Sequence, residues 1–208
     1  MGSRATIPRT ESYACWCCSI AEIRALLRAC NRGPTGARNR ALIVLLRRGG
    51  LRTAEALALR AAGLDPRAGT VLVRRGKGGK RRTVGLDPEG FAVIEAWLAL
   101  RAQLPRVRGS ASLLCTLDGA PLDPGYCRAL IKRLAKRAGV TGRAHLHGLR
   151  HAHAVEMLRE GAPLPALQAQ LGHRSLSVTG RYLAHVSPAD LARLARARAS
   201  WARADEAA

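Results

Sequence analysis

Hydrophobic residues in the first third of the chain recur with the period of an α-helix. About 18 residues without that period come first, and Ser19 and Glu22 then have the spacing of a helix-capping box. The pattern predicts one helix from Ser19 to residues 31–34 and two more over residues 37–48 and 53–60. One face of the first helix should be buried, and its residues are Ile20, Ile23, Leu26, Leu27 and Cys30.

Short β-prone runs interrupt the helical pattern in the middle of the chain. Residues 70–73 and 81–84 are joined by glycine-rich residues 76–79, which predicts a hairpin, and residues 113–116 are expected to form a third strand. Asp87-Pro88 and Asp123-Pro124 each combine an N-cap with a proline at the first helical position. The remaining helices are expected at residues 147–160, at residues 165–171, ahead of Tyr182, and from residue 187. The pattern therefore predicts one mainly helical α+β domain with a small three-stranded antiparallel sheet.

Charge is the strongest signal in the composition. The 208 residues include 35 Lys and Arg against 14 Asp and Glu, a net charge of +21. Codon bias can enrich arginine, but the acidic residues have not risen to balance it. A domain this basic favours a nucleic-acid partner, and 3% aromatic content favours duplex backbone over stacked single strands. The longest apolar run, residues 41–46, is too short to span a bilayer, so we expect a cytoplasmic protein without a membrane partner.

The spacing of potential metal ligands argues against a metal site. The cysteines do not have the paired spacing of a zinc ribbon, no glutamate follows His147 as a zinc-protease motif requires, and the acidic residues do not cluster as in a two-metal nuclease. We therefore expect neither a metal nor a cofactor, and reduced thiols. The residues considered are Cys15, Cys17, Cys18, Cys30, Cys115, Cys127, His145, His147, His151 and His153.

Four side chains in the last third of the chain suit metal-free cleavage of a phosphodiester. His147 and Arg150 are three residues apart, so they share one face near the start of a helix, where backbone amides also attract an anion. His173 follows a glycine that ends the next helix, and Tyr182 follows nine residues later. A tyrosine can form a covalent phosphoester that conserves bond energy for rejoining. Taken singly, each of these side chains is more often a core or surface residue.

The ordered motifs resemble the catalytic domain of the tyrosine recombinases, or phage integrases. The likeness runs from about Ile20 to Val186, most of the chain. The motifs are Gly-Leu-Arg52-Thr-Ala-Glu55, Gly76-Lys77-Gly-Gly-Lys80-Arg-Arg-Thr-Val, His147-Gly-Leu-Arg150-His151, Leu171-Gly-His173 and Thr179-Gly-Arg-Tyr182. The resemblance implies the family's catalytic fold and a site-specific recombinase that cleaves and rejoins double-stranded DNA through a 3′-phosphotyrosine.

The resemblance also implies a role for each matched residue. Arg52 and Arg150 would clamp the scissile phosphate, for which two-pronged guanidinium geometry is well suited. Lys77, in the hairpin, would be the general acid for the 5′ leaving oxygen, although Lys80 lies close enough in sequence to be the alternative. Tyr182 would be the nucleophile.

The other matched residues would support this chemistry. His147 would help to remove the tyrosine proton, and His173 would hydrogen-bond the phosphate. Glu55, one turn after the first arginine, resembles the family's acid that orients the active-site side chains. Arg81 and His151 are expected to contact DNA, together with the second hairpin lysine.

The chain departs from the family at its N-terminus. Only about 18 residues precede the first matched helix, where the family usually carries a core-binding domain, so we expect a loose arm over residues 1–18 and a catalytic domain over residues 19–208. The resemblance implies a homo-oligomer, a tetramer on DNA. Two alternatives remain open: a truncated DNA-binding remnant or regulator without recombination activity, and a nicking-closing enzyme like the type IB topoisomerases.

Overall fold

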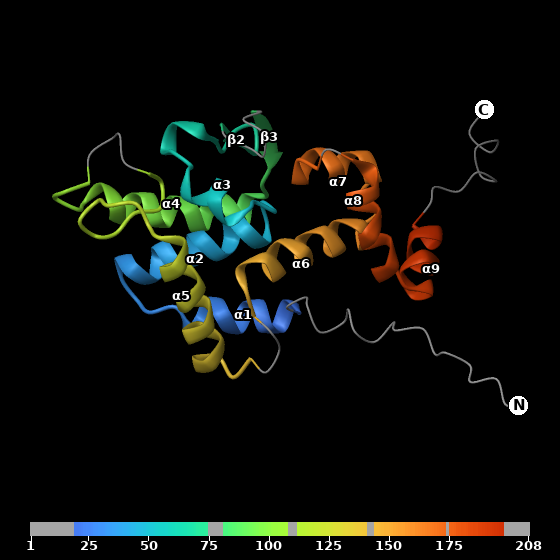
Figure 1. Ribbon diagram of the computed structural model, residues 1–208, viewed down its shortest axis with the longest axis horizontal. Coiled ribbons are helices and arrows are strands. Elements are labelled where there is room, and N and C mark those ends of the chain that lie inside the picture. Colours follow the sequence, from blue (N-terminus) through green and yellow to red (C-terminus); the bar gives the residue numbers. More distant parts are fainter. Residues whose placement is uncertain (1–18, 75–80, 108–111, 141–143, 174, 198–208) are drawn as a thin grey trace, which may run out of the picture.

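Helix α2 (Pro34–Arg47) lies at the centre of the molecule in the computed structural model, which describes residues 19–74, 81–107, 112–140, 144–173 and 175–197. Every residue from Ala41 to Arg47 is buried, because α4 (Pro88–Ala102) and α6 (Leu146–Arg159) pack on it from different sides (Figure 1). Pro34 occupies the first turn, where its missing N–H costs nothing, so the helix begins three residues earlier than predicted.

Three helix starts that were predicted from N-cap residues are found at those caps. In α1 (Ile20–Ala29) the Ser19 side chain accepts from the Glu22 amide and Glu22 accepts from the Ser19 amide, which confirms the capping box. Asp87 caps α4, and Asp123 caps α5 (Pro124–Arg137). One expectation was wrong: Ile20, predicted on the buried face of α1, is 56% exposed because the first turn extends beyond the packed part of the helix.

A small antiparallel sheet packs beside α3 (Thr53–Leu57), which ends three residues before its predicted end. Its strands β1 (Leu64–Asp65), β2 (Thr70–Val73) and β3 (Arg82–Gly85) are ordered β1-β2-β3, and a short 3-10 helix, η2 (Ala61–Gly63), leads into them. In β2 and β3 Val71 pairs with Val84, and both side chains are buried. The antiparallel pairing of the two predicted hairpin strands and the three-stranded sheet are confirmed, while the predicted turn at residues 76–79 lies outside the described residues.

The third strand is not where the sequence predicted it. Residues 64–65 fill that place, while residues 113–116 form only an isolated bridge between Cys115 and Pro121. The Leu113 amide donates to the Leu59 carbonyl, and the Leu113 carbonyl accepts from the Trp97 indole. Because these partners already occupy its backbone, this apolar segment is a buried loop of the core and does not add to the sheet.

The C-terminal third extends from the main body along α6 (Figure 1). It contains α7 (Leu164–Leu171), α8 (Leu176–Gly180), the 3-10 helix η3 (Arg181–His185) and α9 (Pro188–Arg196). A second apolar cluster holds this part together, with Val155 and Leu158 of α6 against Leu167 and Leu171 of α7 and Tyr182 of η3.

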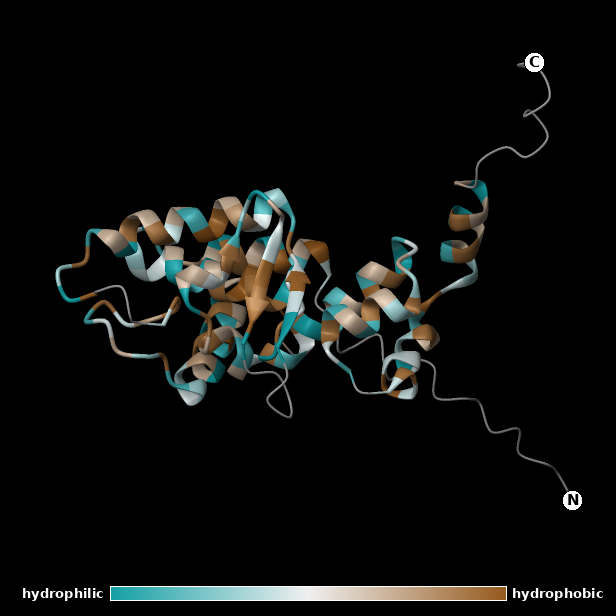
Figure 2. Ribbon diagram, turned by 90° about the horizontal axis from the view of Figure 1, so that it is seen from above, coloured by the Kyte–Doolittle hydropathy of each residue, from teal (hydrophilic) through white to brown (hydrophobic). Residues whose placement is uncertain are grey.

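Helix α9 buries none of its residues, and Figure 2 shows it standing apart from the main body. Leu191 on this helix is 58% exposed. No helix in the described part of the chain is long and apolar enough to cross a membrane.

Candidate active site

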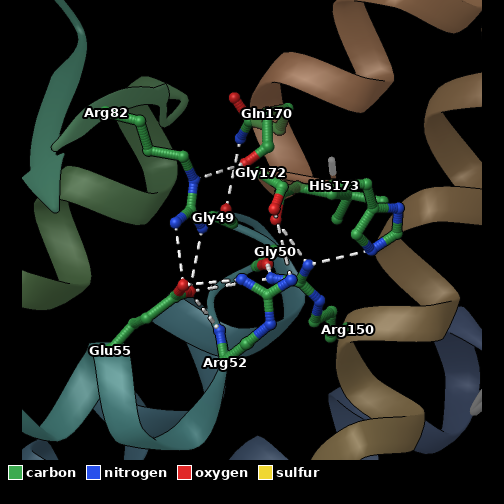
Figure 3. A network of polar contacts seen from close by, with 10 residues as sticks. Gly49, Gly50, Arg52, Glu55, Arg82, Arg150, Gln170, Gly172 and His173 are labelled. Carbon is green, nitrogen blue, oxygen red and sulfur yellow. Dashed lines mark hydrogen bonds and ion pairs between the residues drawn. The ribbon is translucent and has the colours of Figure 1, made fainter. Parts of the chain in front are cut away.

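Glu55 is the centre of a buried charge network that joins three parts of the fold (Figure 3). Its carboxylate accepts from the Arg52 backbone N–H and from Arg52 Nη1, both at 2.8 Å. Arg82 of β3 donates through Nη1 at 2.7 Å and through Nη2 at 2.8 Å. Arg150 Nη1 lies 3.7 Å away. One carboxylate, 4% exposed, therefore aligns three guanidinium groups.

Arg150 is buried and held by backbone carbonyl groups. Its Nη1 donates to the Gly50 carbonyl and its Nη2 to the Leu171 carbonyl, each at 2.6 Å. Gly50 has φ +62°, so the turn before α3 uses a conformation that favours glycine. The same Nη2 lies 3.2 Å from His173 Nε2. The first matched arginine is more open, with its side chain 29% exposed.

His173 is placed by a left-handed glycine at the end of α7. Gly172 has φ +61°, and its carbonyl accepts from Arg52 Nη2 at 3.3 Å. His173 Nδ1 lies 3.0 Å from Thr179 Oγ1, and its carbonyl accepts from Gln168 Nε2 at 3.1 Å. Both ring nitrogens of this histidine thus have polar neighbours, which orients the ring.

Tyr182 is 3% exposed and lies among the imidazoles. Its ring is stacked on that of His173 with 6.3 Å between centroids. The His151 ring lies 5.4 Å from it, and the His147 ring meets the His151 ring edge-on at 4.2 Å. On α6 the His151 ring therefore lies beside the tyrosine ring, with His147 one turn before it.

Burial and the excess of positive charge shift the pKa values across this site. Burial, followed by neighbouring positive groups, lowers the pKa of His147 and lowers the pKa of His151 and His173 to about 4. Burial and a second guanidinium lower the pKa of Arg150 to about 10. For Glu55, burial alone would raise the pKa, but hydrogen bonds from its two arginine partners lower it to about 2. At neutral pH the site thus offers guanidinium groups for an anion and neutral imidazoles for a proton.

Seven of the residues selected from the sequence converge here: Arg52, Glu55, His147, Arg150, His151, His173 and Tyr182. Lys77 and Lys80 lie outside the described residues. Arg81 is exposed and immediately precedes β3. Among the residues that the structure describes, no three His, Cys, Asp or Glu side chains gather as metal ligands would.

Sequence reasoning missed two members of the site. Arg82 makes the two-pronged pair with Glu55, and the Gln170 side chain joins α7 to the turn before α3 and to β3. A signal for the first was available: Arg82 and Val84 are two apart in a predicted strand, so they face the same side. No local pattern marked the glutamine.

The comparison with protein families fits this geometry. The model described as "Phage integrase family" matches residues 19–188, nearly all of the described chain. The chain belongs to the phage integrase family. The resemblance to tyrosine recombinase catalytic domains is thereby confirmed, as is the expected fold.

Relatives of this integrase-family chain are tyrosine recombinases. It is 38% identical over 170 residues to "Tyrosine recombinase XerD" of Xanthomonas axonopodis pv. citri, covering 77% of this chain and 55% of the relative. It is 35% identical over 169 residues to "Tyrosine recombinase XerC" of Lactobacillus delbrueckii subsp. bulgaricus, covering 80% and 57%. The chain therefore spans little more than half the length of these relatives.

A solved structure carries the same fold. The XerH site-specific recombinase, in a post-cleavage complex with a palindromic difH substrate, aligns with a TM-score of 0.71 at 28% identity. That alignment covers 87% of this chain and 52% of the XerH chain.

Proposed function

We propose that this domain cleaves and rejoins double-stranded DNA through a covalent 3′-phosphotyrosine, as a site-specific recombinase. The observation that carries the proposal is the convergence of Arg52 and Arg150 on one buried carboxylate, with His173 in contact with both Arg150 and the tyrosine ring. Two guanidinium groups and an imidazole provide the donors that the phosphate oxygens of a phosphoryl-transfer transition state require. The named activity of the recombinase relatives supports the same conclusion.

In the proposed reaction, each participating atom undergoes one defined change. The Tyr182 phenol oxygen attacks phosphorus and loses its proton, the bond from phosphorus to the 5′ oxygen breaks, and that oxygen takes up a proton. The DNA 3′ end is then joined to the tyrosine. Rejoining is the reverse attack by a 5′ hydroxyl group, so the phosphodiester is regenerated. Arg52 and Arg150 neutralise the charge that develops on the nonbridging oxygens.

The proton leaving the tyrosine needs a neutral base. The resemblance assigned this role to His147, whereas His151, first assigned to DNA contact, has the ring adjacent to Tyr182 at 5.4 Å. Both imidazoles have lowered pKa values and are neutral at pH 7. We therefore assign the proton acceptor to the His147–His151 pair, in which the His151 ring lies beside the tyrosine ring.

The partner that fits this site is duplex DNA. Helix α5 turns a row of basic side chains to solvent, and their positive charge suits a phosphate backbone. They are Arg128, Lys132, Arg133 and Lys136. The XerH structure holds its DNA substrate. For assembly we propose a homo-oligomer on DNA, a tetramer when two duplexes are joined, with exposed α9 as a contact between copies.

The test is covalent capture. The protein is incubated with nicked duplexes of randomised sequence around the nick, and adducts that survive denaturant are counted. The wild type should form an adduct that Tyr182→Phe abolishes, while both proteins bind DNA equally. Binding without any adduct on nicked or supercoiled duplexes would favour the DNA-binding remnant. Relaxation of supercoils without sequence preference would favour the topoisomerase-like enzyme.

The general acid can be assigned with a modified leaving group. Lys77→Ala is expected to slow cleavage of ordinary DNA but to cleave a duplex with sulfur at the 5′ bridging position at the wild-type rate. Sulfur leaves without protonation, so the acid is no longer needed. The matched control is Lys80→Ala. If sulfur rescues that variant in place of Lys77→Ala, the acid is Lys80.

A further inference from the structure

The carboxamide of Gln170 links three segments that each carry part of the site, and Figure 3 shows its bond to Gly49. Its Nε2 donates to the Gly49 carbonyl at 3.2 Å and to the Gly85 carbonyl at 2.9 Å, while its Oε1 accepts from the Gly85 amide at 2.9 Å. In addition, the backbone carbonyl of Gln170 accepts from Arg82 Nε at 3.3 Å. Gln170 of α7 is therefore hydrogen-bonded to the turn before α3 and to both the amide and the carbonyl group of Gly85 in β3.

Of these hydrogen bonds, the one to Gly49 is most directly connected to the arginine clamp, the pair Arg52 and Arg150 that is proposed to hold the phosphate. The next residue, Gly50, is the one whose carbonyl holds Arg150 at 2.6 Å, and Arg52 follows two positions later. On the α7 side of the same hydrogen bond, His173 follows Gln170 by three residues. A shift of the turn relative to α7 would therefore move the arginines relative to the histidine.

Solvent exposure indicates which of the hydrogen bonds made by Gln170 water cannot replace. Gly85 is exposed, so water can replace the glutamine at its amide and carbonyl groups. Gly49 is buried, and a Cβ placed there would lie 2.8 Å from the Leu45 carbonyl, so the turn is closely packed. Loss of the donor at Gly49 leaves a buried carbonyl that the turn must move to satisfy.

We propose that Gln170 is a positioning residue for DNA cleavage: it holds the turn that carries the arginine clamp against the helix that carries His173. The inference rests on the proposed function. It differs from a purely structural role, because α7 is joined to the main body independently of the carboxamide, by the bond from Arg82 Nε to the Gln170 backbone carbonyl and by packing of α7 on β3. Removing the carboxamide should therefore misplace the clamp without unfolding the domain.

Two variants and one control separate these roles. Gln170→Leu keeps side-chain bulk and removes all hydrogen bonds of the carboxamide, and Gln170→Glu keeps an acceptor for the Gly85 amide but loses the donor to Gly49. The control is Gly85→Ala, which keeps its amide and carbonyl groups and whose Cβ would meet only Gln170 Oε1, at 3.8 Å. Each protein is compared with the wild type in adduct formation at saturating protein, in DNA affinity and in thermal unfolding.

The defect should appear in the chemical step. Both Gln170 variants should form the adduct about tenfold more slowly, since small displacements of positioned groups cost this much or more, while DNA affinity changes less than about twofold. A methylphosphonate at the scissile position replaces a charged oxygen and needs less guanidinium stabilisation. The ratio of wild-type to variant rates should therefore fall toward one on that substrate. Gly85→Ala should match the wild type throughout.

Each result decides between the alternatives. Equal adduct rates for wild type and Gln170→Leu overturn the inference and leave the proposed function intact. Parallel losses in rate, affinity and unfolding temperature, or an undiminished defect on methylphosphonate, also overturn it, since the residue would then be structural. If the wild type forms no adduct on any duplex, the proposed function fails and the inference fails with it.

Discussion

Replacing Glu55 by glutamine should destabilise the domain by an amount set by its pKa. The carboxylate accepts hydrogen bonds from Arg52 and Arg82 and is 4% exposed, and its pKa is lowered from 4.5 to about 2. At about 1.4 kcal/mol per pKa unit, the ionised group contributes about 3 kcal/mol to folding. Removing one partner of a buried ion pair costs about the same, 3–5 kcal/mol. We expect Glu55→Gln to lower the free energy of unfolding by about 3 kcal/mol at pH 7.

The sign of the pH dependence follows from the lowered pKa. A carboxylate whose pKa is lower in the folded state stabilises the fold above its unfolded pKa, here 4.5. That contribution is lost as the pH falls through about 2. The difference in unfolding free energy between wild type and Glu55→Gln should therefore be constant from neutral pH down to about pH 5 and become smaller below it.

Urea unfolding followed by circular dichroism from pH 7 to pH 3 measures this gap. Glu95→Gln is the matched control, because Glu95 is exposed on α4, and it should lie within about 0.5 kcal/mol of the wild type. Equal unfolding free energies for wild type and Glu55→Gln at pH 7 would refute the reasoning. So would a gap that stays unchanged through pH 3.

Three further outcomes follow from the site. Gly172→Ala should lower the free energy of unfolding by about 1–2 kcal/mol and slow adduct formation. The reason is that Gly172 has φ +61° and that a Cβ there would lie 2.8 Å from Arg82 Nε. The control Gly180→Ala should change neither quantity, because a Cβ at Gly180 would meet open space. His151→Ala should slow cleavage by Tyr182 about a hundredfold in single-turnover assays while DNA affinity is retained, and an unchanged rate would remove it from the proton path. DNA affinity measured by fluorescence anisotropy should fall steeply and log-linearly with salt, because binding releases counterions, and a flat dependence would contradict backbone contact by the basic surface.

Local signals in the sequence determined most of the secondary structure. Caps at Ser19, Asp87 and Asp123 predicted three helix starts correctly, because a cap depends only on residues three positions apart. The two hairpin strands followed in the same way from short β-prone runs on either side of a glycine-rich segment. The position of the third strand was wrong, because an apolar run pairs with a sheet only if its backbone groups are not already bonded elsewhere.

The amino-acid sequence by itself also determined which residue types are available for the chemistry: Arg150, His173 and Tyr182 were selected from their spacing, and the resemblance to the family's ordered motifs added Arg52 and Glu55. Only the tertiary structure decided how they are held, since the bonds that align them join segments as far as 120 positions apart. No periodicity or local motif encodes such a bond. The role of Gln170 therefore appeared only once α7 was seen to meet β3 and the turn before α3, and the strand pattern that placed Arg82 beside Val84 did not reveal that its partner is Glu55.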